Sequence, residues 1–102
     1  MSLPVRTTPE ADAQILQIDD WRRSNRPAAP GLFMDELAAA FDLIGHAPQI
    51  GRLYRRSPVP GTRRLLLAVS RYHAYYVPEA AEVKVLAVWH ARRGLGPPLR
   101  AR

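Results

Sequence analysis

The sequence contains no cysteine, which excludes both a disulfide framework and a metal site built on thiolates. It also lacks a long apolar run: the longest strongly apolar stretch covers residues 65–69, whereas a membrane-spanning helix needs about 20 apolar residues. The first twenty residues carry Arg6, Glu10 and Asp12 and have no apolar segment of the kind that directs secretion. We therefore expect a soluble, cytoplasmic protein that contacts no membrane and needs no metal or cofactor.

Lysine is almost absent as well, because fourteen of the fifteen basic side chains are arginine and Lys84 is the exception. The charge is divided unevenly along the chain of 102 residues. Residues 1–51 hold four basic and seven acidic side chains, a net charge of −3. Residues 52–102 hold eleven basic and two acidic side chains, a net charge of +9, so that the whole chain carries +6.

An arginine-rich half favours an acidic partner. The planar guanidinium forms two parallel hydrogen bonds with a phosphate or a carboxylate, and it also stacks on bases. A nucleic acid or an acidic protein would therefore suit this half of the chain. The alternative is that the arginines only solvate a surface, as the arginine bias of a GC-rich genome would produce.

The first half of the sequence predicts two helices, over residues 9–24 and 31–44. The apolar stripe of the first helix consists of Ala11, Ile15, Ile18 and Trp21. Residues 25–31 contain two prolines and a glycine, which cannot continue a helix and indicate a tight connection. The two helices are therefore expected to form an antiparallel hairpin.

The second half changes to the pattern of strands. Residues 51–61 contain two prolines and two glycines and are expected to form a loop or an irregular edge of the sheet. Strands are expected over residues 64–69, 72–77 and 83–90, with an earlier edge strand over residues 2–6 and a flexible tail over residues 94–102. The sequence thus predicts a single α+β domain over residues 1–102. It comprises an N-terminal strand, an antiparallel helical hairpin and a three-stranded antiparallel meander that forms one sheet packed on the helices.

The last expected strand is apolar on both of its faces. Strict alternation places Val83, Val85, Ala87 and Trp89 on one face, and Lys84, Leu86, Val88 and His90 on the other. Two helices can cover only one face of the sheet. The pattern therefore predicts either an open apolar patch that binds a protein partner, or a central strand buried on both sides.

Two segments of this half resemble the motifs of a known family. They read Arg71-Tyr72-His73-Ala74-Tyr75-Tyr76-Val77 and Val83-Lys84-Val85-Leu86-Ala87-Val88-Trp89-His90-Ala91-Arg92-Arg93-Gly94. They follow a helical hairpin that opens with Pro9-Glu10 and carries Asn25-Arg26-Pro27 in its turn. In this order, over roughly residues 4–95, these features resemble the RelE/ParE superfamily of toxins from type II toxin–antitoxin (plasmid stabilisation) systems.

The resemblance implies a growth-inhibiting toxin that a cognate antitoxin holds inactive in a toxin–antitoxin hetero-oligomer. In this family the antitoxin lies across the toxin through a helix and an extended tail, which tends to be acidic and amphipathic. The residues expected to contact the antitoxin or the target are Arg55, Arg56, Arg63, Arg71, Leu86, Val88, Arg92 and Arg93.

The resemblance leaves two targets open. The ParE branch binds and poisons DNA gyrase without recognised catalytic residues, whereas the RelE branch cleaves messenger RNA on the ribosome. Cleavage would need arginines that neutralise the phosphate and histidines that move protons. The candidates for these roles are Arg64, Arg71, His73, His90 and Arg92.

Two departures from the RelE pattern favour the ParE branch. RelE ribonucleases generally place a tyrosine shortly after the last strand and carry a lysine-rich segment. This sequence has no aromatic residue after His90 and a single lysine. A third interpretation is a non-catalytic nucleic-acid-binding module with Tyr72, Tyr75 and Tyr76 as a stacking platform, although tyrosines in a sheet also serve as core.

Overall fold

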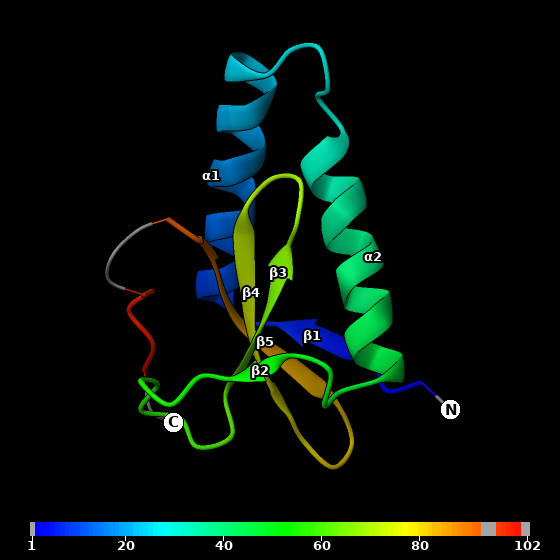
Figure 1. The fold of residues 1–102 in the computed structure, drawn as a ribbon, viewed down its shortest axis with the longest axis vertical. Coiled ribbons are helices and arrows are strands. Elements are labelled where there is room, and N and C mark those ends of the chain that lie inside the picture. The colour runs from blue at the N-terminus through cyan, green and yellow to red at the C-terminus, as the bar shows by residue number, and fades with distance from the viewer. Residues whose placement is uncertain (1, 93–95, 101–102) are drawn as a thin grey trace.

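Two helices cover one face of a five-stranded sheet in the computed structural model, which describes residues 2–92 and 96–100 (Figure 1). In chain order the elements are β1 (Val5–Thr7), α1 (Pro9–Asn25), α2 (Leu32–His46), β2 (Arg52–Leu53), β3 (Arg63–Leu67), β4 (Tyr72–Pro78) and β5 (Val83–His90). The predicted α+β architecture is confirmed, including the N-terminal strand ahead of the helical hairpin. Neither helix of the described chain is long and apolar enough to cross a bilayer.

The sheet has the order β1-β5-β4-β3-β2 and is mixed rather than purely antiparallel. Strands β3, β4 and β5 form the predicted meander, while β1 pairs in parallel with β5, where Val5 lies opposite Val83. The segment 51–61, expected to be a loop or an irregular edge, contains the short edge strand β2, which pairs with β3. Strand β5 therefore lies inside the sheet, with a neighbour on each side.

Thr8 ties the start of α1 to β5. Its hydroxyl accepts a hydrogen bond from the Ala11 N–H at 3.1 Å and donates one to the Leu86 carbonyl at 3.2 Å. The Thr8 N–H donates to the Val85 carbonyl at 3.0 Å. Pro9 at the first helical position has no N–H that would need a partner. Thr8 thus caps the helix and fixes the place where α1 meets the central strand.

The apolar stripe of α1 is buried only in its first part. Ala11 and Ile15 lie in the core, and Ile18 packs against it. Trp21 was expected on the same buried stripe, but it is 50% exposed, so this part of the prediction is wrong. The reason is that the end of α1 extends past the turn between β3 and β4 (Figure 1).

A β-bulge in β5 interrupts the alternation of its side chains. Tyr75 lies opposite Ala87, and Tyr76 lies opposite Val85, so that Leu86 is an extra residue between the two pairs. Residues on the two sides of the bulge therefore exchange faces. The expectation of an uninterrupted alternation along this strand is wrong for this reason.

Strand β5 is buried on both faces. Val83, Val85 and Val88 belong to one core cluster with residues of both helices, and Ala87 on the outer face is 1% exposed. Leu86 and Val88 were expected in an open apolar patch, but they are 9% and 1% exposed. The expected patch is therefore absent at these two residues, and the alternative of a central strand covered on both sides describes the structure.

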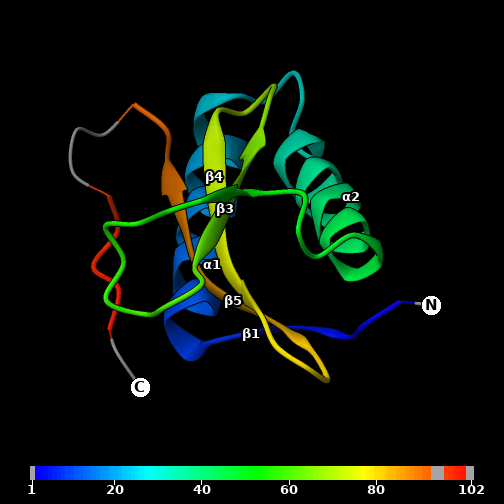
Figure 2. The same cartoon turned by 60° about the horizontal axis from the view of Figure 1, so that its bottom comes forward.

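The outer face of the sheet is partly covered by the loop after β2 and by the segment 96–100, which run side by side (Figures 1 and 2). The rings of Tyr54 and Tyr75 pack edge to face, with centroids 4.9 Å apart. Gly96 lies against Tyr54 so closely that a side chain at this position would collide with the tyrosine hydroxyl. A flexible tail was expected over residues 94–102. Positions 94, 95, 101 and 102 of this tail lie outside the described residues.

Tyr76 anchors the connection between α2 and β2 to the core. Its hydroxyl accepts a hydrogen bond from the Gly51 N–H and donates one to the Pro48 carbonyl, each at 2.8 Å. Burial raises the pKa of Tyr76, so that the hydroxyl keeps the proton it donates. Arg63 donates to the carbonyls of Gln49 at 3.0 Å and Gly51 at 2.7 Å. The Arg63 guanidinium, expected to contact a partner, therefore also holds this connection in place.

Candidate functional site

A groove of about 790 Å³ opens between the helical hairpin and one end of the sheet. Its walls are the second half of α1, the start of α2, the turn between β3 and β4, and the end of β5. The basic side chains that line it are Arg22, Arg26, Arg71, His90 and Arg92. Among the described residues no carboxylate lines this groove, which we call the arginine groove.

Aromatic rings provide the apolar surface of the arginine groove. The Tyr72 ring packs edge to face on Phe33 and on His90, with centroid distances of 5.3 Å and 5.1 Å. Trp21 stands half-exposed at the rim, where the Arg26 guanidinium lies 5.9 Å from the centre of its ring. The groove therefore combines aromatic contact surface with guanidinium groups.

Arg71 reaches the groove from a strained backbone. Its φ of 68° lies in the left-handed region, which costs a residue with a side chain about 1–2 kcal/mol. Its N–H donates to the Leu67 carbonyl at 2.8 Å, and its carbonyl accepts from the Ala91 N–H at 2.9 Å. Glycine would adopt this conformation without strain. An arginine at this position of the turn therefore points to a role for its side chain.

Glu36 of α2 locks the turn that carries Arg71. Its carboxylate accepts hydrogen bonds from the Val69 N–H at 2.7 Å, the Ser70 N–H at 3.0 Å and the Ser70 hydroxyl at 2.6 Å. Burial alone would raise the pKa of Glu36, but the hydrogen bonds from Ser70 and Val69 and the charge of Arg22 outweigh it and lower the pKa. Glu36 is therefore ionised at neutral pH and fastens the turn to α2.

The five residues predicted for RNA cleavage do not come together. Arg71, His90 and Arg92 line the arginine groove, and the His90 Nδ1 accepts a hydrogen bond from the Arg92 N–H at 3.1 Å. Arg64 and His73 lie on the outer face of the sheet, because they alternate with residues that face the helices. The two histidines are therefore on opposite faces.

His73 is surrounded by positive charge. Burial lowers the pKa of His73, and the guanidinium groups of Arg64 and Arg71 lower it further. Its Nδ1 is buried and has no hydrogen-bond partner in the described part of the chain. Its ring lies 5.9 Å from the Tyr75 ring. His73 is consequently neutral at physiological pH.

Four of the six arginines expected to contact a partner are distributed over two surfaces. Arg71 and Arg92 lie in the arginine groove, while Arg55 and Arg56 line a separate cleft on the outer face. Arg93 lies outside the described residues. Across residues 2–92 and 96–100, no three histidine or carboxylate side chains are grouped so that they would hold a metal ion.

The contribution of α1 to the groove was missed in the sequence. Trp21, Arg22 and Arg26 line it, although the half of the chain that contains them carries a net charge of −3. The sequence pattern that could have indicated them is local, because basic residues follow a tryptophan at the end of the predicted helix. The fold then places the end of this helix beside the arginine-rich half of the chain. Glu36 had no signal at all, because its partners are more than 30 residues away in the sequence.

Replacing Glu36 by glutamine should destabilise the protein in a pH-dependent manner. The pKa of Glu36 is lower in the folded than in the unfolded chain, so its stabilising effect is complete above the unfolded pKa and is lost as the pH falls through the folded pKa. Urea denaturation at several pH values should show wild type more stable than Glu36→Gln at pH 7, with the difference vanishing in acid. Asp35→Asn, which changes an exposed neighbour, is the control. A deficit that is equal at all pH values would contradict the role of the charge.

The comparisons with known proteins agree with this fold. The sequence model described as ParE toxin of type II toxin–antitoxin system, parDE, matches residues 5–95. Among solved structures, a chain of the chromosomal ParDE toxin–antitoxin system from P. aeruginosa is similar, with a TM-score of 0.71 and 19% sequence identity. The match covers 89% of this chain and 98% of that chain.

At this level of identity the solved structure shows a shared fold, and no curated protein sequence matches. The sequence model is more informative, since it spans most of the chain from β1 to just beyond β5. This chain therefore belongs to the family of ParE toxins of type II toxin–antitoxin systems.

Proposed function

We propose that this ParE-type toxin inhibits bacterial growth in the cytoplasm by binding DNA gyrase, and that a cognate antitoxin neutralises it by occupying the arginine groove. The observation that carries the proposal is the charge of the groove. Its basic lining consists of four arginines and one histidine, with no carboxylate among the described residues. An acidic protein segment is the complement of such a surface.

The chemistry of the groove suits an acidic, amphipathic segment. None of its four arginines takes part in an ion pair within the described chain, where the paired basic residues are Arg6, Arg23, His46 and Lys84. Arg22 is buried and lies within electrostatic reach of Glu36, whereas Arg26, Arg71 and Arg92 are available for charge-assisted hydrogen bonds. Trp21 and Tyr72 offer apolar surface beside them, which would receive the apolar side of the same segment.

The separation of the histidines supports gyrase rather than messenger RNA as the target. A ribonuclease needs its proton carriers close to one phosphate, whereas His73 and His90 lie on opposite faces of the sheet. Arg71, His90 and Arg92 do share the arginine groove, and these are suitable residue types for RNA cleavage. The RelE-type activity is therefore the second candidate, and it would use the groove residues alone.

Expression of the chain alone is expected to arrest bacterial growth, and co-expression of its antitoxin should restore it. With purified protein, ATP-dependent supercoiling by gyrase should decrease, while ribosome-bound messenger RNA should stay intact. Normal growth at confirmed soluble expression would exclude the toxin activity. Message cleavage that is lost in His90→Ala would show the RelE-type activity and contradict gyrase as the target.

Arg71→Gly should separate folding from antitoxin binding. Glycine removes the strain of the left-handed backbone, so the free energy of unfolding should stay equal or rise by up to about 1 kcal/mol. Loss of the guanidinium should weaken antitoxin binding at least about tenfold, as measured by calorimetry. Arg52→Ala removes one exposed arginine outside the groove and is the matched control. Equal affinities of the two variants would place the antitoxin elsewhere.

A further inference from the structure

A second, smaller cleft of about 390 Å³ opens on the outer face of the sheet. It lies between the loop after β2, the outer side of β3 and β4, and the segment at residue 96. The residues that give it its chemistry are Tyr54, Arg55, Arg56, Arg64 and Tyr75, and we call it the arginine–tyrosine cleft. It shares no lining residue with the arginine groove, so it is a separate surface.

Arg64 is held in this cleft by two aromatic side chains. The Arg64 Cζ lies 5.3 Å from the centre of the Tyr54 ring, which is a cation–π contact. The Arg64 guanidinium also lies near the Tyr75 hydroxyl, and its charge partly offsets the rise in pKa that burial gives Tyr75. Tyr75 is 2% exposed and is therefore packed on all sides. The guanidinium carries five N–H donors, and no ion pair of the described residues uses one of them.

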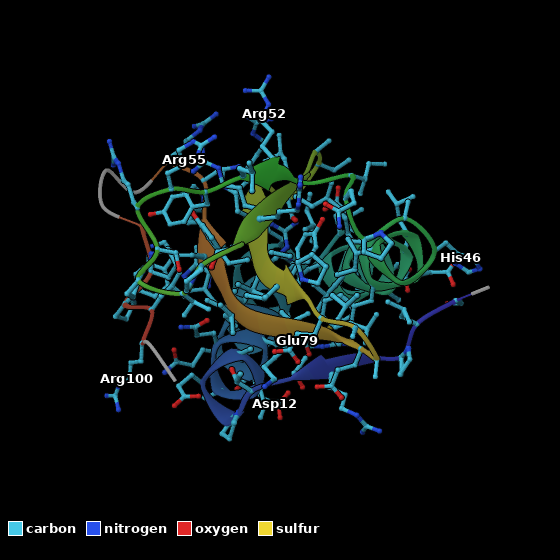
Figure 3. The ribbon with its side chains drawn as sticks, turned by 90° about the horizontal axis from the view of Figure 1, so that it is seen from below. Asp12, His46, Arg52, Arg55, Glu79 and Arg100 are labelled. Atoms are coloured by element: carbon cyan, nitrogen blue, oxygen red, sulfur yellow. The ribbon has the colours of Figure 1, made fainter. Side chains whose placement is uncertain are left out.

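The cleft concentrates positive charge that the fold does not neutralise. Arg55 and Arg56 are exposed on the loop beside Arg64, and none of the three forms an ion pair within the described residues. No carboxylate lines the cleft in the part of the chain that the structure describes. Figure 3 shows Arg55 together with Arg52 at one edge of the molecule, far from Asp12.

The position of Arg64 distinguishes the cleft from an ordinary solvated surface. An arginine that only keeps a protein soluble extends into water and samples many conformations. Arg64 is half-buried and lies against an aromatic ring, with the buried Tyr75 side chain beside it. Such a guanidinium has already lost the conformational freedom that binding would otherwise remove, which favours ligand binding.

We infer that the arginine–tyrosine cleft binds a phosphate ester of a nucleotide or of a single-stranded nucleic acid. The Arg64 guanidinium would donate two parallel hydrogen bonds to two phosphate oxygens, and the exposed Arg55 and Arg56 would interact with the remaining negative charge of the phosphate. The Tyr54 ring and the exposed Leu53 at the edge of the cleft provide apolar contact for a base. This binding is independent of the proposed antitoxin site, because it uses none of the groove residues.

The test measures fluorescence anisotropy of the full chain with a labelled single-stranded RNA or DNA oligonucleotide, at about 50 mM salt to favour phosphate contacts. Arg55→Ala/Arg56→Ala changes two exposed residues and should fold normally, yet lower the affinity at least about tenfold. Arg64→Lys keeps the charge but loses the fork, and it should weaken binding as well. Arg6→Ala/Arg23→Ala removes two arginines outside the cleft and should change the affinity less than about twofold.

Competition identifies the source of the phosphate. Displacement of the oligonucleotide by an unlabelled nucleoside monophosphate would show that the cleft takes a single nucleotide. Binding of the oligonucleotide alone, with a steep salt dependence, would assign the cleft to a nucleic acid strand. The inference is overturned if neither ligand binds, or if the control variant loses as much affinity as the cleft variants.

Discussion

The fold depends on the extra residue in the central strand. The bulge at Leu86 allows Val83 and Val85 to face the helices before it and Val88 to face them after it. Without it, His90 would turn to the outer face and would not pack on Tyr72, which lies opposite it in β4. The Leu86 carbonyl also accepts a hydrogen bond from the hydroxyl of Thr8, the residue that caps α1. The bulge thus fixes the start of α1, the packing of the core valines and the position of His90 in the wall of the groove.

The same arrangement leaves the positive charge of the protein available to partners. Ion pairs within the described chain use basic residues outside the two cationic surfaces, such as Arg6 with Glu82 and Arg23 with Asp19. The arginines of the groove and of the cleft have no such partner, and both surfaces include aromatic rings. Strain at Arg71 and the ionised Glu36 that fastens its turn show that the fold keeps one of these arginines in place. Charge complementarity at such surfaces gives a partner specificity and a fast association rate more than raw affinity.

Much of the architecture was predictable from the sequence, because it depends on local patterns. The helical hairpin follows from apolar spacing and from the prolines of its turn, and the meander follows from strand segments separated by short connections. The face on which each side chain of β5 lies was not predictable, because the bulge depends on pairing with β4 rather than on the strand's own residues. The site was predictable only in part: Arg71 and Arg92 stood in motifs, whereas Trp21 and Arg22 belong to an acidic half and join the groove through tertiary packing.

The central claim is that the antitoxin occupies the arginine groove, and amide hydrogen exchange of the toxin alone and in the complex tests it most directly. Slower exchange on binding is expected in the second half of α1, in residues 68–72 and at the end of β5, which together form the groove. The β1 edge and the β4–β5 turn, which lie outside the groove, should exchange at the same rate in both states. Protection confined to those two regions, with an unchanged groove, would contradict the account.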